Sequence, residues 1–121
     1  MKPDNEPPVL IITGPCGSGK TTLVKDLAQH QIKARQVAQE HSFVPDMWQK
    51  LAHPDILIFL DASFETCKKR KQFDWTVEDY KEQKRRLRHA RQHSNLYIQT
   101  DGKSPLEVLE TVLEALRIGH T

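Results

Sequence analysis

The residues with the clearest chemistry form one short segment, Gly14-Pro15-Cys16-Gly17-Ser18-Gly19-Lys20-Thr21. Its spacing, G-x-x-x-x-G-K-[ST], is typical of a loop whose backbone N–H groups converge on phosphate oxygens. Gly17 and Gly19 supply the backbone freedom for this, because glycine adopts strained conformations cheaply and has no side chain to block the phosphates. Lys20 adds a positive charge for the β and γ phosphates, and the Thr21 hydroxyl can bind the Mg²⁺ ion that bridges them. The segment therefore predicts a nucleoside triphosphate site, with ATP or another NTP and Mg²⁺ as cofactors.

The elements on either side of this loop fit the same function. An apolar, β-branched run, Val9–Thr13, precedes it, and helical spacing of apolar residues begins at Lys20. The N-terminus of that helix adds positive potential where the phosphates gather. We expect the phosphates to contact the loop and the first helical residues: Gly14, Pro15, Cys16, Gly17, Ser18, Gly19, Lys20, Thr21 and Thr22.

The rest of the chain alternates between strand and helix patterns. Strands are predicted at 9–13, 34–38, 55–61 and 96–99. Helices are predicted at 20–30, in a short stretch within 43–54, from after Ser63 through 71, at 76–93 and at 105–118. This order predicts an α/β fold of three layers, with a small, mostly parallel sheet between helices. Residues 1–8 contain three prolines and are predicted to be a flexible leader before a single domain over 9–121.

Composition narrows the class of protein. The chain has 121 residues, 37% of them hydrophobic and 28% charged, as in a globular domain. Its longest apolar runs, 9–12 and 56–60, fall far short of the roughly 20 residues that a membrane span needs. The N-terminus does not resemble a secretory signal, so we expect a cytoplasmic protein without a membrane partner. Cys16 and Cys67 lie far apart, which favours free thiols over a disulfide or a cysteine-rich zinc cluster.

A basic block covers residues 68–91, where ten Lys or Arg stand against four Asp or Glu, although the whole chain has a net charge of only +2. Such a block is either a solvated helix face or a surface that meets an anion. Both interpretations stay open on sequence alone.

Together with the phosphate loop, two further segments resemble the P-loop kinases of nucleosides, nucleotides and small metabolites, such as adenylate, thymidylate and shikimate kinases. The first is 58–70, a strand that ends in Leu60-Asp61, a helix start and Arg70 nine residues after the aspartate. The second is 96–108, which is similar to the last strand, turn and closing helix of these kinases. The chain is identified as a shortened member of the group.

The resemblance implies roles for several residues outside the phosphate loop. Arg70 would be a lid arginine that closes on the transferring phosphate, and a second lid charge could come from Arg85, Arg88 or Arg91. Asp61 follows four apolar residues, a pattern that by itself indicates a metal ligand, whereas the resemblance implies a structural role, because the corresponding aspartate of these kinases is usually structural. The turn Thr100-Asp101-Gly102-Lys103 would lie beside the nucleotide base.

The chain departs from these kinases between its second and third predicted strands, 34–38 and 55–61. This stretch is too short for the usual acceptor-binding helices and a separate metal-binding strand. Glu40 is then the acid best placed to activate an acceptor hydroxyl or to position Mg²⁺ through water. A plain surface glutamate is the alternative.

These observations favour a Mg²⁺-dependent phosphotransferase, which would move the γ-phosphoryl group of ATP to a small-molecule acceptor not yet identified. Lys20, Arg70 and Glu40 are its predicted catalytic residues. One alternative is an NTP-binding or hydrolysing switch that works through a protein partner. Another, less favoured, is a kinase or binder of nucleic-acid ends, in which the basic block follows the backbone.

Overall fold

A sheet of four parallel strands forms the centre of the protein, seen in a computed structural model that describes residues 8–71 and 74–119. The strands are β1 (Leu10–Thr13), β2 (Ala34–Gln36), β3 (Ile56–Asp61) and β4 (Leu96–Gln99), in the order β2-β1-β3-β4. All but Pro8 of the predicted leader lies outside the described residues, so the division into leader and domain stays a prediction.

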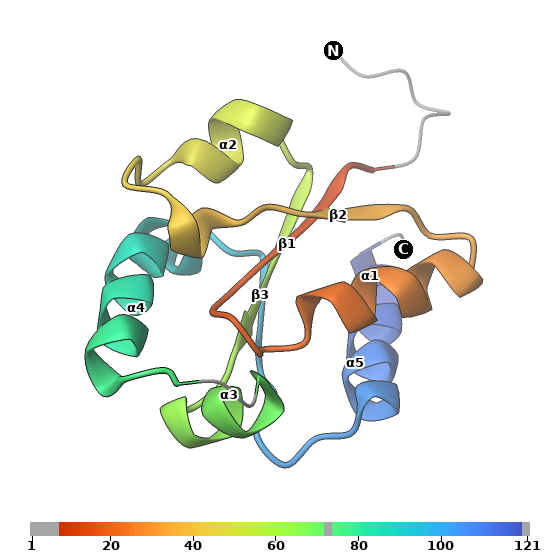
Figure 1. Ribbon diagram of the computed structural model, residues 1–121. Helices are drawn as coiled ribbons and strands as arrows, with labels where there is room; N and C mark the ends of the chain where they lie inside the picture. The colour runs from red at the N-terminus through yellow and green to blue at the C-terminus, as the bar shows by residue number, and fades with distance from the viewer. Residues whose placement is uncertain (1–7, 72–73, 120–121) are drawn as a thin grey trace.

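Helices cover both faces of this sheet (Figure 1). They are α1 (Lys20–Gln29), the short 3₁₀ helix η1 (Gln39–His41), α2 (Met47–Ala52), α3 (Phe64–Lys71), α4 (Val77–Gln92) and α5 (Pro105–Gly119). α1 and α5 pack on one face, and α2 and α4 lie on the other. The predicted three-layer α/β/α fold is confirmed.

Strand β3 holds the two layers of helices together, because its alternate side chains point to opposite faces. Ile58 and Leu60 pack with α1 and α5, whereas Leu57 and Phe59 pack with α2 and α4. All four are almost fully buried. A strand buried on both faces needs a continuous apolar run, which is why this element was the clearest strand in the sequence.

The chain between β2 and β3 differs in detail from the prediction. β2 ends at Gln36 rather than at residue 38, and residues 39–41 form η1. The Val37 side chain instead turns into the core, while the buried Gln39 side chain accepts a hydrogen bond from the Trp48 amide and donates to the Val44 carbonyl. These contacts fix η1 between the sheet and α2, a result that the local pattern of residues 32–39 could not reveal.

The helix boundaries follow local signals. α4 begins with a capping box, in which the Thr76 hydroxyl accepts from the Asp79 amide and the Asp79 carboxylate accepts from the Thr76 amide. The predicted interruption between the helix that ends at residue 71 and the helix at 76–93 falls partly outside the described residues. No helix in the part of the chain that the structure describes has the length and apolar character to cross a membrane.

The phosphate loop leads into α1, and α1 packs on β3. Shortening a buried side chain of α1 should therefore reduce the stability of the protein. We expect Leu27→Ala, at a fully buried site, to lower the free energy of unfolding by about 2–5 kcal/mol. The matched control Leu106→Ala, where the side chain is 61% exposed, should change it by less than about 0.5 kcal/mol. Chemical denaturation followed by circular dichroism measures both, and equal losses would contradict the core assignment.

Candidate functional site

The phosphate loop connects β1 to α1 and depends on close backbone packing. Gly14 has φ +152°, and a β-carbon there would overlap the backbone carbonyl oxygen of Leu60 on β3. Gly19, at the N-cap of α1, has φ +104° with open space where a side chain would begin. The first glycine lets the loop lie against the sheet, and the second leaves room for a ligand at the start of the helix.

A cavity of about 560 Å³ lies beside this loop. The cavity is lined by the loop and α1, by the end of β2 and the segment after it, by the end of α3, by the turn after β4 and by the start of α5. The lining residues are Cys16, Gly17, Ser18, Gly19, Lys20, Thr21, Thr22, Leu23, Asp26, Gln36, Ala38, Glu40, His41, Arg70, Lys71, Thr100, Lys103, Pro105 and Val108. These segments follow the C-terminal ends of parallel strands, the usual place for a ligand in an open α/β sheet.

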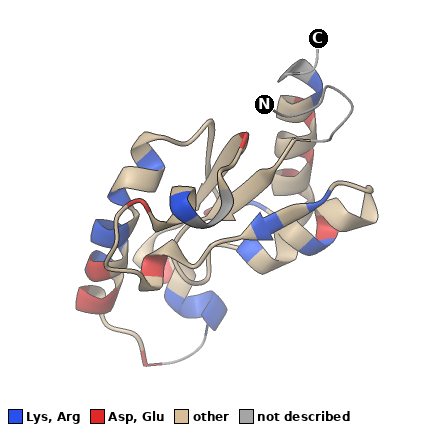
Figure 2. Cartoon of the chain, turned by 90° about the horizontal axis from the view of Figure 1, so that it is seen from above, with Lys and Arg blue, Asp and Glu red and all other residues tan. Residues whose placement is uncertain are grey.

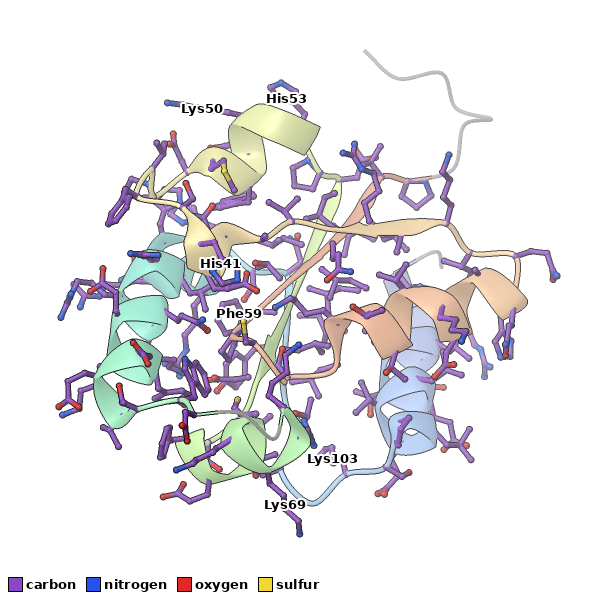
Figure 3. The ribbon with its side chains drawn as sticks, in the orientation of Figure 1. His41, Lys50, His53, Phe59, Lys69 and Lys103 are labelled. Carbon is purple, nitrogen blue, oxygen red and sulfur yellow. The ribbon has the colours of Figure 1, made fainter. Side chains whose placement is uncertain are left out.

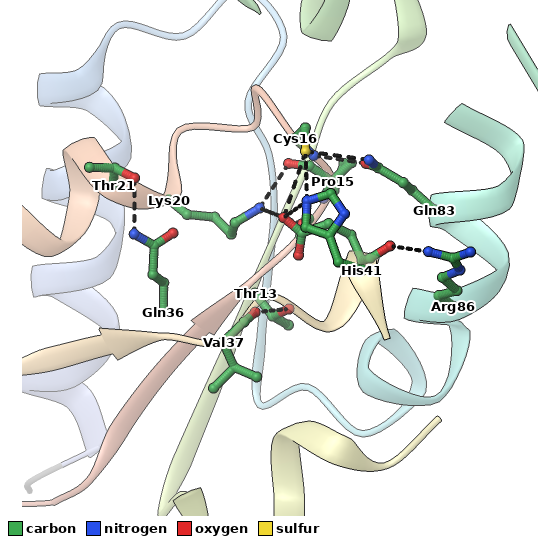
Figure 4. Close-up of polar contacts among 12 residues, drawn as sticks. Thr13, Pro15, Cys16, Lys20, Thr21, Gln36, Val37, His41, Gln83 and Arg86 are labelled. Atoms are coloured by element: carbon green, nitrogen blue, oxygen red, sulfur yellow. Dashed lines mark hydrogen bonds and ion pairs between the residues drawn. The ribbon is translucent and has the colours of Figure 1, made fainter. Parts of the chain in front are cut away.

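Lys20 is folded back into the wall of the cavity. Its ammonium nitrogen donates to the carbonyl oxygens of Gly14 (2.6 Å) and Pro15 (3.2 Å) and to Glu40 Oε2 (2.6 Å). Figure 4 shows the Lys20 side chain pointing toward Pro15, with dashed lines that mark the contacts of its nitrogen. The residue is only 8% exposed. All three hydrogens of the ammonium therefore have acceptors, and a bound phosphate would have to replace at least one of them.

Glu40 comes from η1 and is as deeply buried as its partner, with its side chain only 4% exposed. Its Oε2 pairs with Lys20, whereas its Oε1 is buried and has no hydrogen-bond partner within the described residues. Arg86 of α4 donates to the Glu40 backbone carbonyl and so holds η1 in place. The structure thus places this carboxylate in the same cavity as the Lys20 ammonium, while its catalytic role stays a prediction.

The cavity walls fit a nucleotide phosphate and Mg²⁺ in their chemistry. Ser18 Oγ is buried without a hydrogen-bond partner among the described residues, so a phosphate oxygen could accept its hydrogen. The Thr21 hydroxyl is exposed and accepts a hydrogen bond from Gln36 (3.0 Å). Thr21 and the Glu40 carboxylate are hard oxygen donors in one cavity, the donor type that Mg²⁺ prefers.

Arg70 connects the phosphate loop to the end of β4. Its guanidinium donates to the Gly17 carbonyl, to the Thr100 hydroxyl and to the Thr100 carbonyl, each at 3.0 Å. The side chain also lines the cavity. It therefore lies where a lid arginine would, and its closure on a phosphate stays a prediction.

Only two of the four residues in the predicted base-binding turn line the cavity. Thr100 and Lys103 line the cavity, whereas the Asp101 carboxylate accepts from the Ser63 amide at the start of α3. Burial alone would raise the pKa of Asp101, but hydrogen bonds from Ser63 and Thr66 lower it below its usual value. Gly102 has φ +71° and forms the turn itself. Contact with a base remains a prediction for all four residues.

Asp61 lies outside the set of residues that line this cavity. Its carboxylate is nearly buried and accepts hydrogen bonds from Lys84 Nζ (2.6 Å), the Tyr97 hydroxyl (2.6 Å) and the Ala62 amide (3.0 Å). Burial and the hydrogen bond to Asp61 raise the pKa of Tyr97 to about 12. This geometry favours the structural alternative for Asp61, which joins β3, β4 and α4, over the predicted metal role.

The arginines considered for a second lid charge do not line the cavity in the described structure. Arg85 pairs with Glu82 on its own helix, and Arg91 lies over the Tyr97 ring, 4.9 Å from its centroid. Figure 2 shows the acidic residues of α4 gathered toward one end of the helix and the basic residues toward the other. Much of the basic block is therefore paired within the protein, which favours its interpretation as a solvated face.

Gln83 supports the loop in a way that was not predicted. Its side-chain oxygen accepts from the Cys16 amide (3.0 Å), and its nitrogen donates to Cys16 Sγ (3.3 Å). The signal was present in the sequence, because Gln83 occupies the same helical face as the buried Leu87 and Ala90. A glutamine on the apolar face of a helix needs a partner, and the phosphate loop supplies it.

The two cysteines are free, as predicted, but they differ in environment. Burial raises the pKa of Cys67 to about 11, which keeps that thiol protonated near neutral pH. Cys16 is partly exposed and lines the cavity.

A protein-family model described as "AAA domain" matches residues 10–116, which include every element from β1 to most of α5. No curated protein gives a significant match to the sequence.

The two interpretations of Asp61 predict different behaviour for Asp61→Asn. A structural role predicts a loss of about 1–3 kcal/mol in unfolding free energy, because Lys84 loses its charged partner, and unchanged affinity for Mg²⁺-nucleotide. Denaturation and calorimetry measure the two quantities, with Glu110→Gln on the exposed face of α5 as the control. Normal stability combined with weaker Mg²⁺-dependent binding would restore the metal role.

Proposed function

Because the chain belongs to the AAA domain family, a P-loop NTPase-type family with kinase-like members, we propose that it is a Mg²⁺-dependent phosphotransferase. Its substrates would be ATP and a small-molecule acceptor with a hydroxyl group. The observation that carries this proposal is the pair of Lys20 and Glu40, an ammonium and a carboxylate that meet at 2.6 Å in the wall of the phosphate-loop cavity.

The first step is the binding of the triphosphate. The phosphates would take the open space at Gly19 and the N-terminus of α1, where the helix dipole favours negative charge. The Lys20 ammonium would exchange its bond to Glu40 for the β and γ phosphates. Ser18 Oγ would gain the partner that it lacks.

Mg²⁺, when bound, supplies positive charge that offsets the charge developing on the transferring group. Thr21 would hold it directly, and Glu40 would hold it through water. Both residues line the cavity, which supports this assignment.

Glu40 would then act on the acceptor. Once Lys20 has moved to the phosphates, Glu40 Oε2 has lost its ammonium partner and can accept a hydrogen bond from the acceptor hydroxyl. In our proposal Glu40 accepts the proton of the acceptor hydroxyl as its oxygen bonds to the γ phosphorus. The bond from that phosphorus to the β–γ bridging oxygen breaks, and ADP leaves.

Arg70 and the turn after β4 complete the proposed site. The Arg70 guanidinium, now held by Gly17 and Thr100, would turn to the transferring phosphate and stabilise its charge. Thr100 and Lys103 would border the base.

We also propose a cytoplasmic location, because both cysteines are free thiols, as is usual where thiols are kept reduced.

One observation favours the second function, an NTP-dependent switch. The loop that follows η1 exposes Phe43 (81%) and Val44 (44%), an apolar tip three residues from Glu40. A protein partner could bind this tip and sense the state of η1. Acceptor-dependent formation of ADP would favour the kinase, whereas partner capture that depends on NTP would favour the switch.

Removal of Lys20 should weaken nucleotide binding. Lys20→Met alone would leave Glu40 buried without a partner and should cost about 3–5 kcal/mol of stability, so we pair it with Glu40→Gln. The double variant should fold and bind Mg²⁺-ATP roughly 10- to 150-fold more weakly, the equivalent of one charge-assisted hydrogen bond. Calorimetry measures the affinity, with exposed Lys25→Met as the control. Unchanged affinity in the folded double variant would rule out the phosphate role of Lys20.

The single variant Glu40→Gln separates catalysis from binding. The amide oxygen can still accept from Lys20, but the side chain can no longer take a proton. We expect the rate of acceptor-dependent ADP formation to fall about 10²- to 10⁴-fold, with a smaller change in the KM for ATP. A coupled ADP assay measures this, and exposed Glu78→Gln on α4 serves as the control. If Glu40→Gln retains the wild-type rate, Glu40 is not the base.

A further inference from the structure

Three side chains of different chemistry meet at the inner wall of the cavity: Cys16, Glu40 and His41. Cys16 belongs to the phosphate loop, and the other two belong to η1. Cys16 Sγ lies 3.5 Å from His41 Nε2 and 3.8 Å from Glu40 Oε2, and the Glu40 and His41 atoms are 4.0 Å apart (Figure 4). Figure 3 shows the His41 side chain above the phosphate loop, far from His53 at the end of α2.

These separations are close to those in a tetrahedral zinc site. Zinc bonds of about 2.3 Å to sulfur and about 2.0–2.2 Å to nitrogen or oxygen hold neighbouring ligand atoms about 3.4–3.7 Å apart. The three donor atoms therefore need to move by only a few tenths of an ångström to share one ion. A thiolate among the donors favours zinc over Mg²⁺, which prefers oxygen ligands.

An independent observation also points to a missing cation. Glu40 Oε1 is buried, the side chain is 96% inaccessible, and no hydrogen bond reaches that oxygen within the described residues. A buried carboxylate oxygen without a partner is costly, and an ion bound to both oxygens of the Glu40 carboxylate would give Oε1 a partner. Lys20 could leave Oε2 for the ion and still keep the carbonyls of Gly14 and Pro15.

The surroundings suit coordination at Cys16. Gln83 donates to Cys16 Sγ, and outer hydrogen bonds of this kind orient and strengthen metal ligands. His41 is 60% exposed, so an ion can reach the donors from solvent. The thiol proton would pass to solvent on binding.

We propose that Cys16, Glu40 and His41 form a zinc-binding site in the wall of the phosphate-loop cavity, with the fourth coordination position open to the cavity. The site does not rest on the proposed phosphotransferase activity. It does restrict that activity, because a zinc ion on Glu40 occupies the carboxylate that would accept the proton. The zinc-bound and reaction-competent forms of the cavity are therefore alternative states.

Calorimetric titration of the full chain with Zn²⁺, without nucleotide, tests the site. The wild-type protein should bind one ion per chain, and His41→Ala should bind at least about 100-fold more weakly, more than the loss of an outer hydrogen bond causes. His41 is exposed, so this variant should keep the fold. The matched control is His93→Ala, because His93 and His89 form a stacked pair on α4 that is the competing place for an ion.

Co²⁺ provides a second readout that identifies the ligands. The wild-type protein should show a thiolate-to-cobalt charge-transfer band in the near ultraviolet, and Cys16→Ser should lack it. No zinc binding by the wild type, equal binding by His41→Ala, loss of binding in His93→Ala, or a band that persists in Cys16→Ser would each overturn the proposal. The zinc titration contains no nucleotide, so a failure of ATP binding in the same preparation would count only against the proposed function.

Discussion

The ion pair between Lys20 and Glu40 is the interaction on which the arrangement of this site depends. Both side chains are almost completely removed from water, and a buried charge is tolerated only when a partner of opposite sign offsets its lost hydration. Lys20 also holds the carbonyls of Gly14 and Pro15. One ammonium thus connects the phosphate loop, the first turn of α1 and η1.

The rest of the fold supports the two ends of this pair. On the loop side, β1 lies between β2 and β3, with Gly14 packed against the Leu60 carbonyl. On the η1 side, Gln39 fixes the segment to α2, and Arg86 of α4 binds the Glu40 carbonyl. Both layers of helices therefore contribute to one distance of 2.6 Å. The site is a property of the whole sheet rather than of the glycine-rich segment alone.

The local sequence was sufficient to predict the strands, the helices and the phosphate loop. The apolar run of β3 and the helical spacing after Lys20 each act over a few neighbouring residues, so their structures could be predicted. The glycines were predicted from their motif, although Gly14 and Gly17 lie against the backbone of Leu60 and Cys67, which are distant in the sequence. Glu40 was expected near the site because the residues after a parallel strand lie at the ligand-binding edge of the sheet. The burial of its carboxylate in η1 depends on contacts with α2 and α4 that topology does not specify.

The contacts that were missed join residues far apart in the chain. Gln83 is 67 residues from Cys16, and the Lys84 and Tyr97 side chains reach Asp61 across 23 and 36 residues. The contacts of Gln83 and Lys84 depend on how α4 packs against the sheet, and that of Tyr97 depends on the pairing of β4 with β3. No local pattern specifies either arrangement. The apolar run before Asp61 suggested a metal role, but the hydrogen bonds of its carboxylate depend on packing between distant elements.

The 3₁₀ helix η1 has two consecutive buried polar residues, Gln39 and Glu40, whose side chains face different neighbours. A single inserted residue within it would rotate one of them out of register and leave its partners unsatisfied. The segment at 42–46, in contrast, is only partly covered, and its Phe43 side chain is 81% exposed. Variation in length during evolution would be confined to that segment, where an insertion leaves the charges beneath it in place.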